Sequence, residues 1–302
     1  MKIITIVFLA LSYSAQASEH IVADNIWTAV EKTEALARKY GPTHVLFASD
    51  LDNTLLKTKQ DLASEPWFNW QDGLLKEPAN EHRIACDVPD LLHFFYVTIA
   101  LSQLSPVQED QSKAIQKMQA QSIPTIIVTA RGEAVASSTF RELNKNNLDF
   151  SKVNLAGNGY GAPHLPWDLA KPEASGLTQK DIEKLKLSEA RPILFQRGVL
   201  FSDGQNKGAL LRSIIHKTKR DIKAVVFWDN DKKNTQRVFD AFEGTGVEVV
   251  SIRASRQDTD IQRFVDSDKT KVTQDYLVLR KLLDETYLYP RPCVLPIDKK
   301  KN

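Results

Sequence analysis

Two carboxylates lie two residues apart in the segment Asp50-Leu51-Asp52-Asn53-Thr54-Leu55. The mainly apolar residues 44–49 come directly before them, and a short apolar run that ends in a turn predicts a buried strand. Side chains two apart on an extended chain leave the same face, so Asp50 and Asp52 are expected to point together out of the carboxyl edge of a sheet. Such a pair can bind a hard cation, and one carboxylate can attack a substrate while the other moves a proton.

Two further residues, Thr129 and Lys207, suit the binding of a phosphate group. Thr129 ends the apolar run 125–128, where a hydroxyl and the backbone N–H groups of the following helix can cradle a phosphate. Arg131 follows two residues later and is a secondary candidate. Lys207 opens a predicted helix and places positive charge where a helix already attracts anions. Each has an ordinary alternative, since a threonine can cap a helix and most lysines are solvated.

A second group of carboxylates follows the strongly apolar residues 224–228. Asp229 comes directly after this run, and Asp231 lies two residues further on. Carboxylates at the end of a buried strand are costly unless they meet a cation or water. Asp229 is therefore a candidate cation ligand, and Asp231 either holds a metal-bound water or caps the next helix.

Strand and helix patterns alternate along most of the chain, from a helix capped by Asp24 or Asn25 to a helix over about 273–288. Alternation with apolar strands predicts an α/β fold, with a Rossmann-like parallel sheet that carries helices on both faces. Residues 153–155 are expected to form a short third strand, and residues 193–201 a β-hairpin.

The alternation is interrupted by a long, mainly helical insert over residues 59–118. Three aromatic residues near its start, Trp67, Phe68 and Trp70, either pack the insert onto the core or line a lid over the substrate. We favour packing, because aromatic side chains are mostly packing residues. The expected organisation is a signal peptide at 1–17, a core at 18–58 and 119–289, the insert at 59–118, and an extended tail at 290–302.

Four of these positions resemble, in order, the four motifs of the haloacid-dehalogenase-like (HAD) superfamily. The match extends over residues 44–234, and the chain also resembles, more loosely, an uncharacterised family of exported bacterial HAD-like proteins. One departure is Asn230, which separates two aspartates that are adjacent in many relatives. The matching positions, in order, are Asp50-Leu51-Asp52-Asn53-Thr54, Thr129, Lys207 and Asp229.

The resemblance implies an HAD-like core with a helical cap and the activity of a magnesium-dependent phosphatase. Asp50 would attack phosphorus and become an aspartyl-phosphate, and Asp52 would act first as an acid and then as a base. Mg²⁺ would be held by Asp50, the backbone carbonyl of Asp52, and Asp229, with Asp231 as a secondary candidate. The implied phosphate-binding residues are Thr129 and Lys207.

The first 17 residues have the pattern of a secretory signal peptide. Lys2 supplies positive charge, residues 3–11 form an apolar stretch too short to span a bilayer, and Ala15-Gln16-Ala17 is a small-x-small cleavage signal. No later stretch is long and apolar enough for a membrane span, so we expect a periplasmic or secreted protein.

The composition argues against two classes of partner. A formal net charge of +2 gives no strong field for nucleic acid or acidic lipid. The six histidines and two cysteines form no paired spacing, so no zinc site is predicted. Cys86 and Cys293 either form one disulfide in an oxidising compartment or stay separate thiols.

The sequence thus predicts an exported, magnesium-dependent hydrolase that acts on a small-molecule phosphate monoester. The alternative is a non-catalytic exported binding or effector protein that retains the fold. Four charged groups at strand ends favour the enzyme, because a binding module has no reason to hold them there. The substrate and the oligomeric state stay open.

Overall fold

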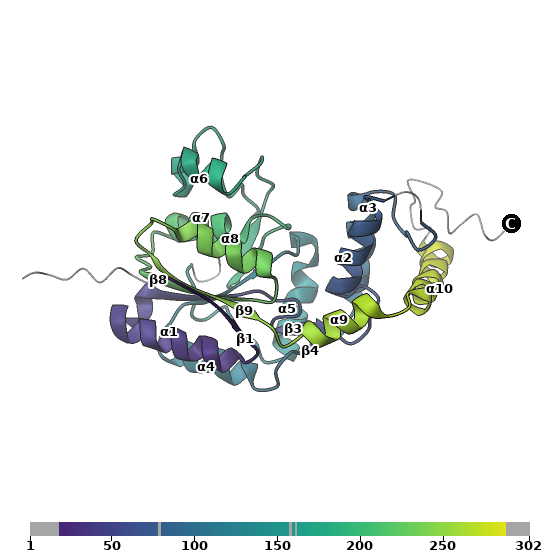
Figure 1. The fold of residues 1–302 in the computed structure, drawn as a ribbon, viewed down its shortest axis with the longest axis horizontal. Helices are drawn as coiled ribbons and strands as arrows, with labels where there is room; N and C mark the ends of the chain where they lie inside the picture. The colour runs from purple at the N-terminus through teal and green to yellow at the C-terminus, as the bar shows by residue number, and fades with distance from the viewer. Residues whose placement is uncertain (1–17, 78–79, 157–158, 161, 288–302) are drawn as a thin grey trace, which may run out of the picture.

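The computed structural model describes residues 18–77, 80–156, 159–160 and 162–287. The predicted signal peptide (1–17) and the predicted tail (290–302) lie outside the described residues. The described chain is an α/β protein around a mostly parallel seven-stranded sheet (Figure 1). Its strands are β1 (Glu19–Ala23), β2 (Val45–Ser49), β5 (Thr125–Thr129), β6 (Leu194–Gln196), β7 (Val199–Phe201), β8 (Ala224–Asp229) and β9 (Glu248–Ala254).

These strands lie in the order β1-β9-β8-β2-β5-β7-β6, and each neighbouring pair is parallel except β6–β7. Every residue of β2, β5 and β8 is buried. In β2, Phe47 belongs to the apolar cluster on one face of the sheet, while Leu46 and Ala48 belong to the cluster on the other. Helices cover both faces, which is why the central strands are continuously apolar.

Two sets of helices form these covering layers (Figure 1). Asn25 begins the first helix by accepting a hydrogen bond from the backbone of Trp27, as expected for a capping asparagine. One face carries α1 (Ile26–Tyr40), α4 (Gln111–Ala120) and α5 (Ala136–Lys145), and the other carries α6 (Gln179–Lys184), α7 (Lys207–Thr218) and α8 (Lys232–Phe242).

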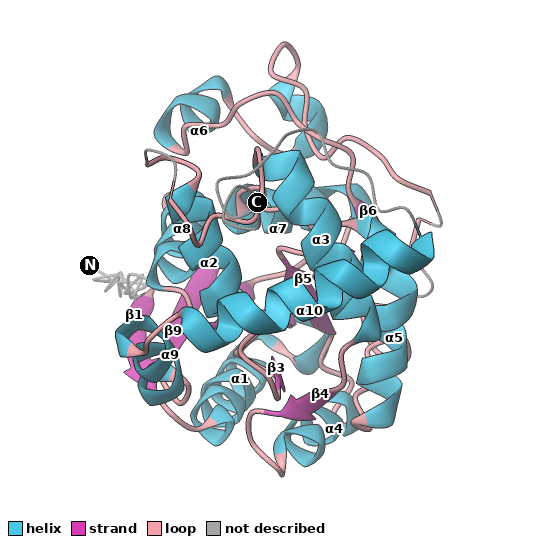
Figure 2. Cartoon of the chain, turned by 90° about the vertical axis from the view of Figure 1, so that its right-hand side faces the viewer, coloured by secondary structure: helices cyan, strands magenta, loops and turns pink. Residues whose placement is uncertain are grey.

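A separate group of helices lies at one end of the sheet, and we call it the helical unit. Its members share a third apolar cluster that contains Trp67, Phe94, Phe264 and Tyr276. Figure 1 shows the unit beside the sheet, and Figure 2 shows it in front when the molecule is viewed from that side. The helical unit consists of α2 (Glu65–Leu74), α3 (Val88–Leu101), α9 (Asp258–Asp266) and α10 (Thr270–Tyr287).

A two-stranded antiparallel ribbon joins the sheet to the helical unit. It consists of β3 (Leu56–Thr58) and β4 (Leu104–Pro106), which are the segments by which the chain leaves the core and returns. The backbone N–H of Leu104 donates to Glu142 Oε2 on α5 at 2.8 Å, which ties the ribbon to the core. The two ends of the insert are therefore held together close to the segment Asp50–Leu55, which precedes β3.

The structure differs from the sequence analysis in several elements. The predicted strand at 153–155 is wrong: Val153 accepts one backbone hydrogen bond from Thr125, but no ladder forms. The strand β1 was not predicted, because it is an edge strand whose residues alternate between partly buried and exposed. The predicted β-hairpin is confirmed as β6–β7.

The packing of three helices also differs from the expected division of the chain. The helix α4, which falls mostly within residues 59–118, places Ala114, Ile115 and Met118 in the core under the sheet. The helices α9 and α10, which fall within 119–289, pack in the helical unit instead. Sequence order alone did not reveal this, since each of these helices has an apolar face that suits either partner.

The aromatic residues of the insert are packing residues, as favoured, but they pack within the helical unit rather than onto the core. Trp67 is buried and its ring centroid lies 5.8 Å from that of Phe94. Phe68 lies 4.9 Å from Phe95, and Trp70 meets Phe264 edge-on at 6.1 Å. These rings hold the helices of the unit to one another.

Cys86 is disulfide-bonded, and the other cysteine of the chain, Cys293, lies outside the described residues. Among the described helices, none has both the length and the apolar character that a membrane span requires.

The close contact between α7 and α8 generates a stability prediction. A methyl group on Gly208 would lie 2.3 Å from the carbonyl oxygen of Arg237, whereas one on Gly73 would meet nothing within 4 Å. We expect Gly208→Ala to lower the free energy of unfolding by about 1–3 kcal/mol, because the backbone of α7 or α8 must move to make room for the methyl group. Gly73→Ala, the matched control in α2, should raise the free energy of unfolding by roughly 0.5–1 kcal/mol, because alanine favours the helix more than glycine does. Chemical denaturation measures both, and equal effects would contradict the packing described.

Candidate active site

The order of the strands brings the predicted site residues to one edge of the sheet. Asp50 follows β2, Thr129 ends β5 and Asp229 ends β8. The strand β2 lies between β8 and β5, and all three are parallel, so their carboxyl ends meet. The backbone N–H of Asp50 donates to the carbonyl of Trp228 at 2.8 Å, which fixes the two acidic segments side by side.

Lys207 is the centre of this group. Its Nζ atom lies 2.6 Å from Asp50 Oδ1 and 2.7 Å from Asp229 Oδ2. It is the first residue of α7, and Asn206 caps that helix by accepting from the backbone of Gly208 and Ala209. The lysine side chain is only 2% exposed, so it is not the solvated surface lysine of the alternative interpretation.

Burial and mutual repulsion shift the titration of these groups. Burial raises the pKa of Asp50, although the Lys207 ammonium opposes the shift. Burial also raises the pKa of Asp229 to about 7. The Lys207 charge opposes this rise, and the Asp50 charge adds to it. Burial alone would lower the pKa of Lys207, but Asp229 and Asp50 more than offset this and raise it. The lysine is therefore a fixed cation at neutral pH.

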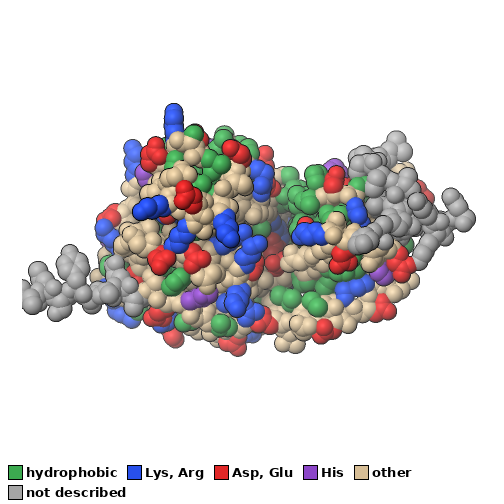
Figure 3. Space-filling view, turned by 45° about the horizontal axis from the view of Figure 1, so that its top comes forward, with side chains coloured by type: hydrophobic (Ala, Val, Ile, Leu, Met, Phe, Trp, Pro, Cys, Tyr) green, Lys and Arg blue, Asp and Glu red, His purple; other side chains and the backbone are tan. Residues whose placement is uncertain are grey.

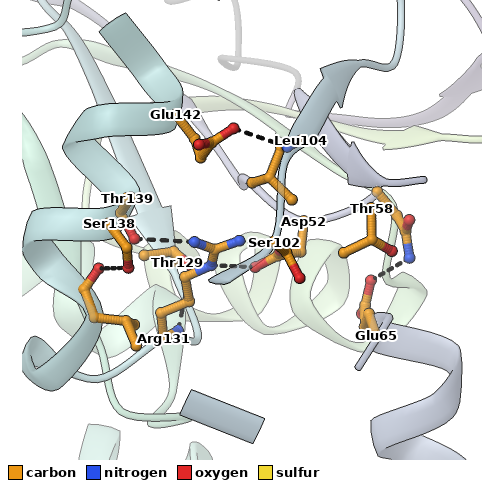
Figure 4. Close-up of polar contacts among 12 residues, drawn as sticks. Asp52, Thr58, Glu65, Ser102, Leu104, Thr129, Arg131, Ser138, Thr139 and Glu142 are labelled. Atoms are coloured by element: carbon orange, nitrogen blue, oxygen red, sulfur yellow. Dashed lines mark hydrogen bonds and ion pairs between the residues drawn. The ribbon is translucent and has the colours of Figure 1, made fainter. Parts of the chain in front are cut away.

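Asp52 is held by Arg131 through two parallel hydrogen bonds (Figure 4). Arg131 Nε lies 2.8 Å from Asp52 Oδ2, and Nη2 lies 2.7 Å from Oδ1. The third nitrogen, Nη1, donates to Thr139 Oγ1 on α5 at 2.9 Å. Arg131 is buried, so this fork-to-fork pair orients the carboxylate firmly.

Two other candidates have local roles. Thr129 is buried, and its Oγ1 accepts from the backbone N–H of Arg131 at 3.2 Å. Asp231 caps α8 by accepting from the backbone of Lys233, and its own N–H donates to Asp229 Oδ1 at 2.8 Å. Of the two interpretations of Asp231, the structure shows the cap.

Sequence reasoning missed Glu65, the first residue of α2. Its Oε2 accepts from Asn53 Nδ2 at 2.8 Å and from Asn230 Nδ2 at 3.3 Å. Burial raises its pKa well above the ordinary value, and the charges of Asp50, Asp52 and Asp229 add to the shift. The segment Ser64-Glu65-Pro66 signals only a helix start, so nothing in it indicated contact with a site fifteen residues upstream.

The donor set fits a divalent cation in charge and chemistry. Among the described residues, no three His, Cys, Asp or Glu side chains are grouped into a cation site. A Mg²⁺ site does not require three such side chains, because Mg²⁺ usually keeps several waters. Two carboxylates, one backbone carbonyl and waters are enough to bind it. The site contains four carboxylates and two basic groups. When all six are ionised, the net charge is −2. The carboxylates are Asp50, Asp52, Glu65 and Asp229, and the basic groups are Lys207 and Arg131.

The site lies between the two parts of the molecule. Glu65 belongs to the helical unit, and the other charged groups belong to the core. Figure 3 shows the surface hollowed between the body around the sheet and the helical unit.

Fold and site together define an α/β protein whose sheet carries a buried lysine–carboxylate group at its carboxyl edge. Residues 23–288 match the model of a family described as "Protein of unknown function (DUF2608)", and the chain belongs to this family. No curated protein and no solved structure matches the chain. The resemblance to the HAD superfamily therefore rests on the residues quoted above and stays a prediction.

The raised pKa of Asp229 generates a prediction for stability. Between its ordinary value of 3.8 and its folded value of about 7, the folded chain keeps a proton that the unfolded chain has lost. This group therefore lowers the free energy of unfolding as pH rises through that range. We expect Asp229→Asn to remove that decline, so that the Tm in chelator changes less between about pH 5 and about pH 8 than in the wild-type chain. The variant should also be less stable at each pH, because Lys207 keeps only one of its two buried carboxylate partners.

The matched control is Asp266→Asn, at an exposed position on α9. Calorimetry in chelator at a series of pH values measures both variants. The same pH dependence in Asp229→Asn as in the wild-type chain would contradict the assignment.

Proposed function

We propose that this chain is a magnesium-dependent phosphatase that hydrolyses small phosphate monoesters through an aspartyl-phosphate on Asp50. The observation that carries the proposal is the position of Lys207 Nζ between Asp50 and Asp229. A nucleophilic carboxylate needs a neighbouring cation that admits an anionic substrate, and a buried lysine at a helix start supplies one. Asp52, two residues from Asp50, supplies the second acidic group that phosphoryl transfer needs.

In the first half of the reaction, an Asp50 carboxylate oxygen attacks phosphorus and the bond to the leaving oxygen breaks. Asp52 enters this step as the carboxylic acid and gives its proton to that leaving oxygen, so an alcohol departs, Asp52 becomes a carboxylate and a phosphoryl group stays on Asp50. Lys207 stabilises the charge of the transferring group. Thr129 lies at the end of the neighbouring strand and contributes to the phosphate cradle.

In the second half, Asp52 takes a proton from water, and the water oxygen attacks phosphorus. The bond between phosphorus and Asp50 breaks, which releases inorganic phosphate and restores the carboxylate. Arg131 acts as a positioning residue, because it fixes the direction of the Asp52 carboxylate through both oxygens.

Asp50, the backbone carbonyl of Asp52, and Asp229 would hold the magnesium ion. When bound, the ion neutralises phosphate charge and orients the phosphoryl group. In this proposal the sheet with its covering helices is an HAD-like core, and the helical unit is a cap that selects the leaving group. Residues 1–17 direct export, so the enzyme acts in the periplasm or outside the cell.

The first test is hydrolysis of a generic aryl phosphate and a panel of natural phosphate monoesters by the purified mature chain. We expect turnover that needs Mg²⁺, stops in chelator, and falls on the order of 10³-fold or more in Asp50→Asn. Asp266→Asn is the control and should keep full activity. A folded wild-type chain that hydrolyses none of these esters in Mg²⁺ would favour the non-catalytic binding protein.

The Asp52–Arg131 pair gives a second prediction. Lysine at position 131 keeps the charge but cannot make two parallel hydrogen bonds to one carboxylate. We expect Arg131→Lys to lower kcat roughly 10–100-fold with little change in KM. The reason is that Asp52 loses its fixed orientation, while the contacts that bind the substrate stay the same. Steady-state kinetics separates the two constants. A change confined to KM would show that Arg131 binds substrate instead.

A further inference from the structure

We infer that Glu65 belongs to the cation site and supplies, from the helical unit, the carboxylate that Asn230 does not provide. This inference rests on the proposed function, since it concerns the magnesium ion of the same site. It adds a residue that no motif of the core contains.

The first observation is the hydrogen bonding of Glu65. Its Oε2 accepts from the side-chain amides of Asn53 and Asn230, at 2.8 Å and 3.3 Å. Asn53 follows Asp52 and Asn230 follows Asp229, so the two donors belong to the two acidic segments of the core. Figure 4 shows Asp52 lying between Arg131 and Glu65.

The second observation is that the Asn230 amide is fixed in direction. Asn230 Oδ1 accepts from Thr54 Oγ1 at 3.0 Å, and the backbone N–H of Asn230 donates to the same hydroxyl oxygen at 3.0 Å. With its oxygen held by Thr54, the amide must turn its NH₂ group toward Glu65. Asn230 therefore places an NH₂ donor where an aspartate would place a negatively charged oxygen. The Glu65 carboxylate accepts from this donor and so places a negative charge beside it.

The third observation is the charge balance. When Asp50, Asp52 and Asp229 are all ionised, they exceed the charge of Lys207 and Arg131 by one. Ionised Glu65 brings this excess to two, which equals the charge of one divalent cation. Glu65 is half-buried, and its carboxylate lies beside the two acidic segments of the core.

A structural consequence follows from the origin of Glu65. The direct ligands expected for the ion come from the core, whereas Glu65 begins α2 of the helical unit. Binding of the ion then strengthens the attachment of the helical unit to the edge of the sheet.

The test is calorimetric titration of the mature chain with Mg²⁺ alone, which needs no substrate. The variants are Glu65→Gln, which keeps shape and acceptor, Asn230→Asp, and the double variant. Asp61→Asn is the matched control, because it removes a carboxylate near the start of α2 that pairs instead with Arg263. Thermal unfolding in chelator checks that every variant is folded.

We expect Glu65→Gln to weaken Mg²⁺ binding about 10–100-fold, as loss of an outer carboxylate does elsewhere. The double variant should return to within about threefold of wild type, because Asn230→Asp restores the lost charge. Asp61→Asn should bind as wild type does.

The unfavourable outcomes are distinct. Wild-type binding with an unchanged Glu65→Gln overturns the inference and leaves the proposed function intact. A double variant as weak as Glu65→Gln also overturns it, since Glu65 would then act by packing rather than by charge. A folded wild-type chain that binds no Mg²⁺ removes the proposed function and the inference together.

Discussion

The contact of one buried lysine with two buried aspartates is the constraint on which the site depends. Burial disfavours the charged form of Lys207, Asp50 and Asp229, and the contacts among the three groups oppose that cost. The fold meets this requirement because β2 and β8 are adjacent and parallel and α7 begins beside their ends. Because Gly208 has no side chain, α7 can pack closely against α8, the helix that follows Asp229.

A second set of contacts fixes the helical unit to that group. Glu65 on α2 reaches both acidic segments through Asn53 and Asn230. On the other side, Tyr96 of α3 accepts from the backbone N–H of Gly132, next to Arg131. The helical unit therefore touches the site through polar groups from two of its helices, and its apolar cluster holds those helices in register.

Local sequence pattern was sufficient for the core and for most of the site. The apolar runs before Asp50, Thr129 and Asp229 are buried central strands, and such strands cannot be confused with surface segments. A parallel sheet then brings their ends together, so the nearness of Asp50 to Asp229 followed from pattern alone.

The remaining parts depended on contacts between distant segments. The place of Glu65 in the site depends on its contact with Asn230, which is 165 residues away in the sequence, so local pattern does not reveal it. The position of α10 depends on Tyr276 meeting Phe94, and a helix with one apolar face does not reveal its partner. Edge strand β1 carries too few buried residues to form a recognisable pattern.

We propose that Asp50 carries the phosphoryl group during turnover. Acid quenching of the purified mature chain while it reacts with the phosphate ester that it hydrolyses fastest, followed by peptide mass spectrometry, tests this directly. We expect one added phosphoryl group on the peptide that contains Asp50, and none on that peptide in Asp50→Asn. Rapid hydrolysis by wild type without that adduct, together with hydrolysis by Asp50→Asn at the wild-type rate, would contradict it.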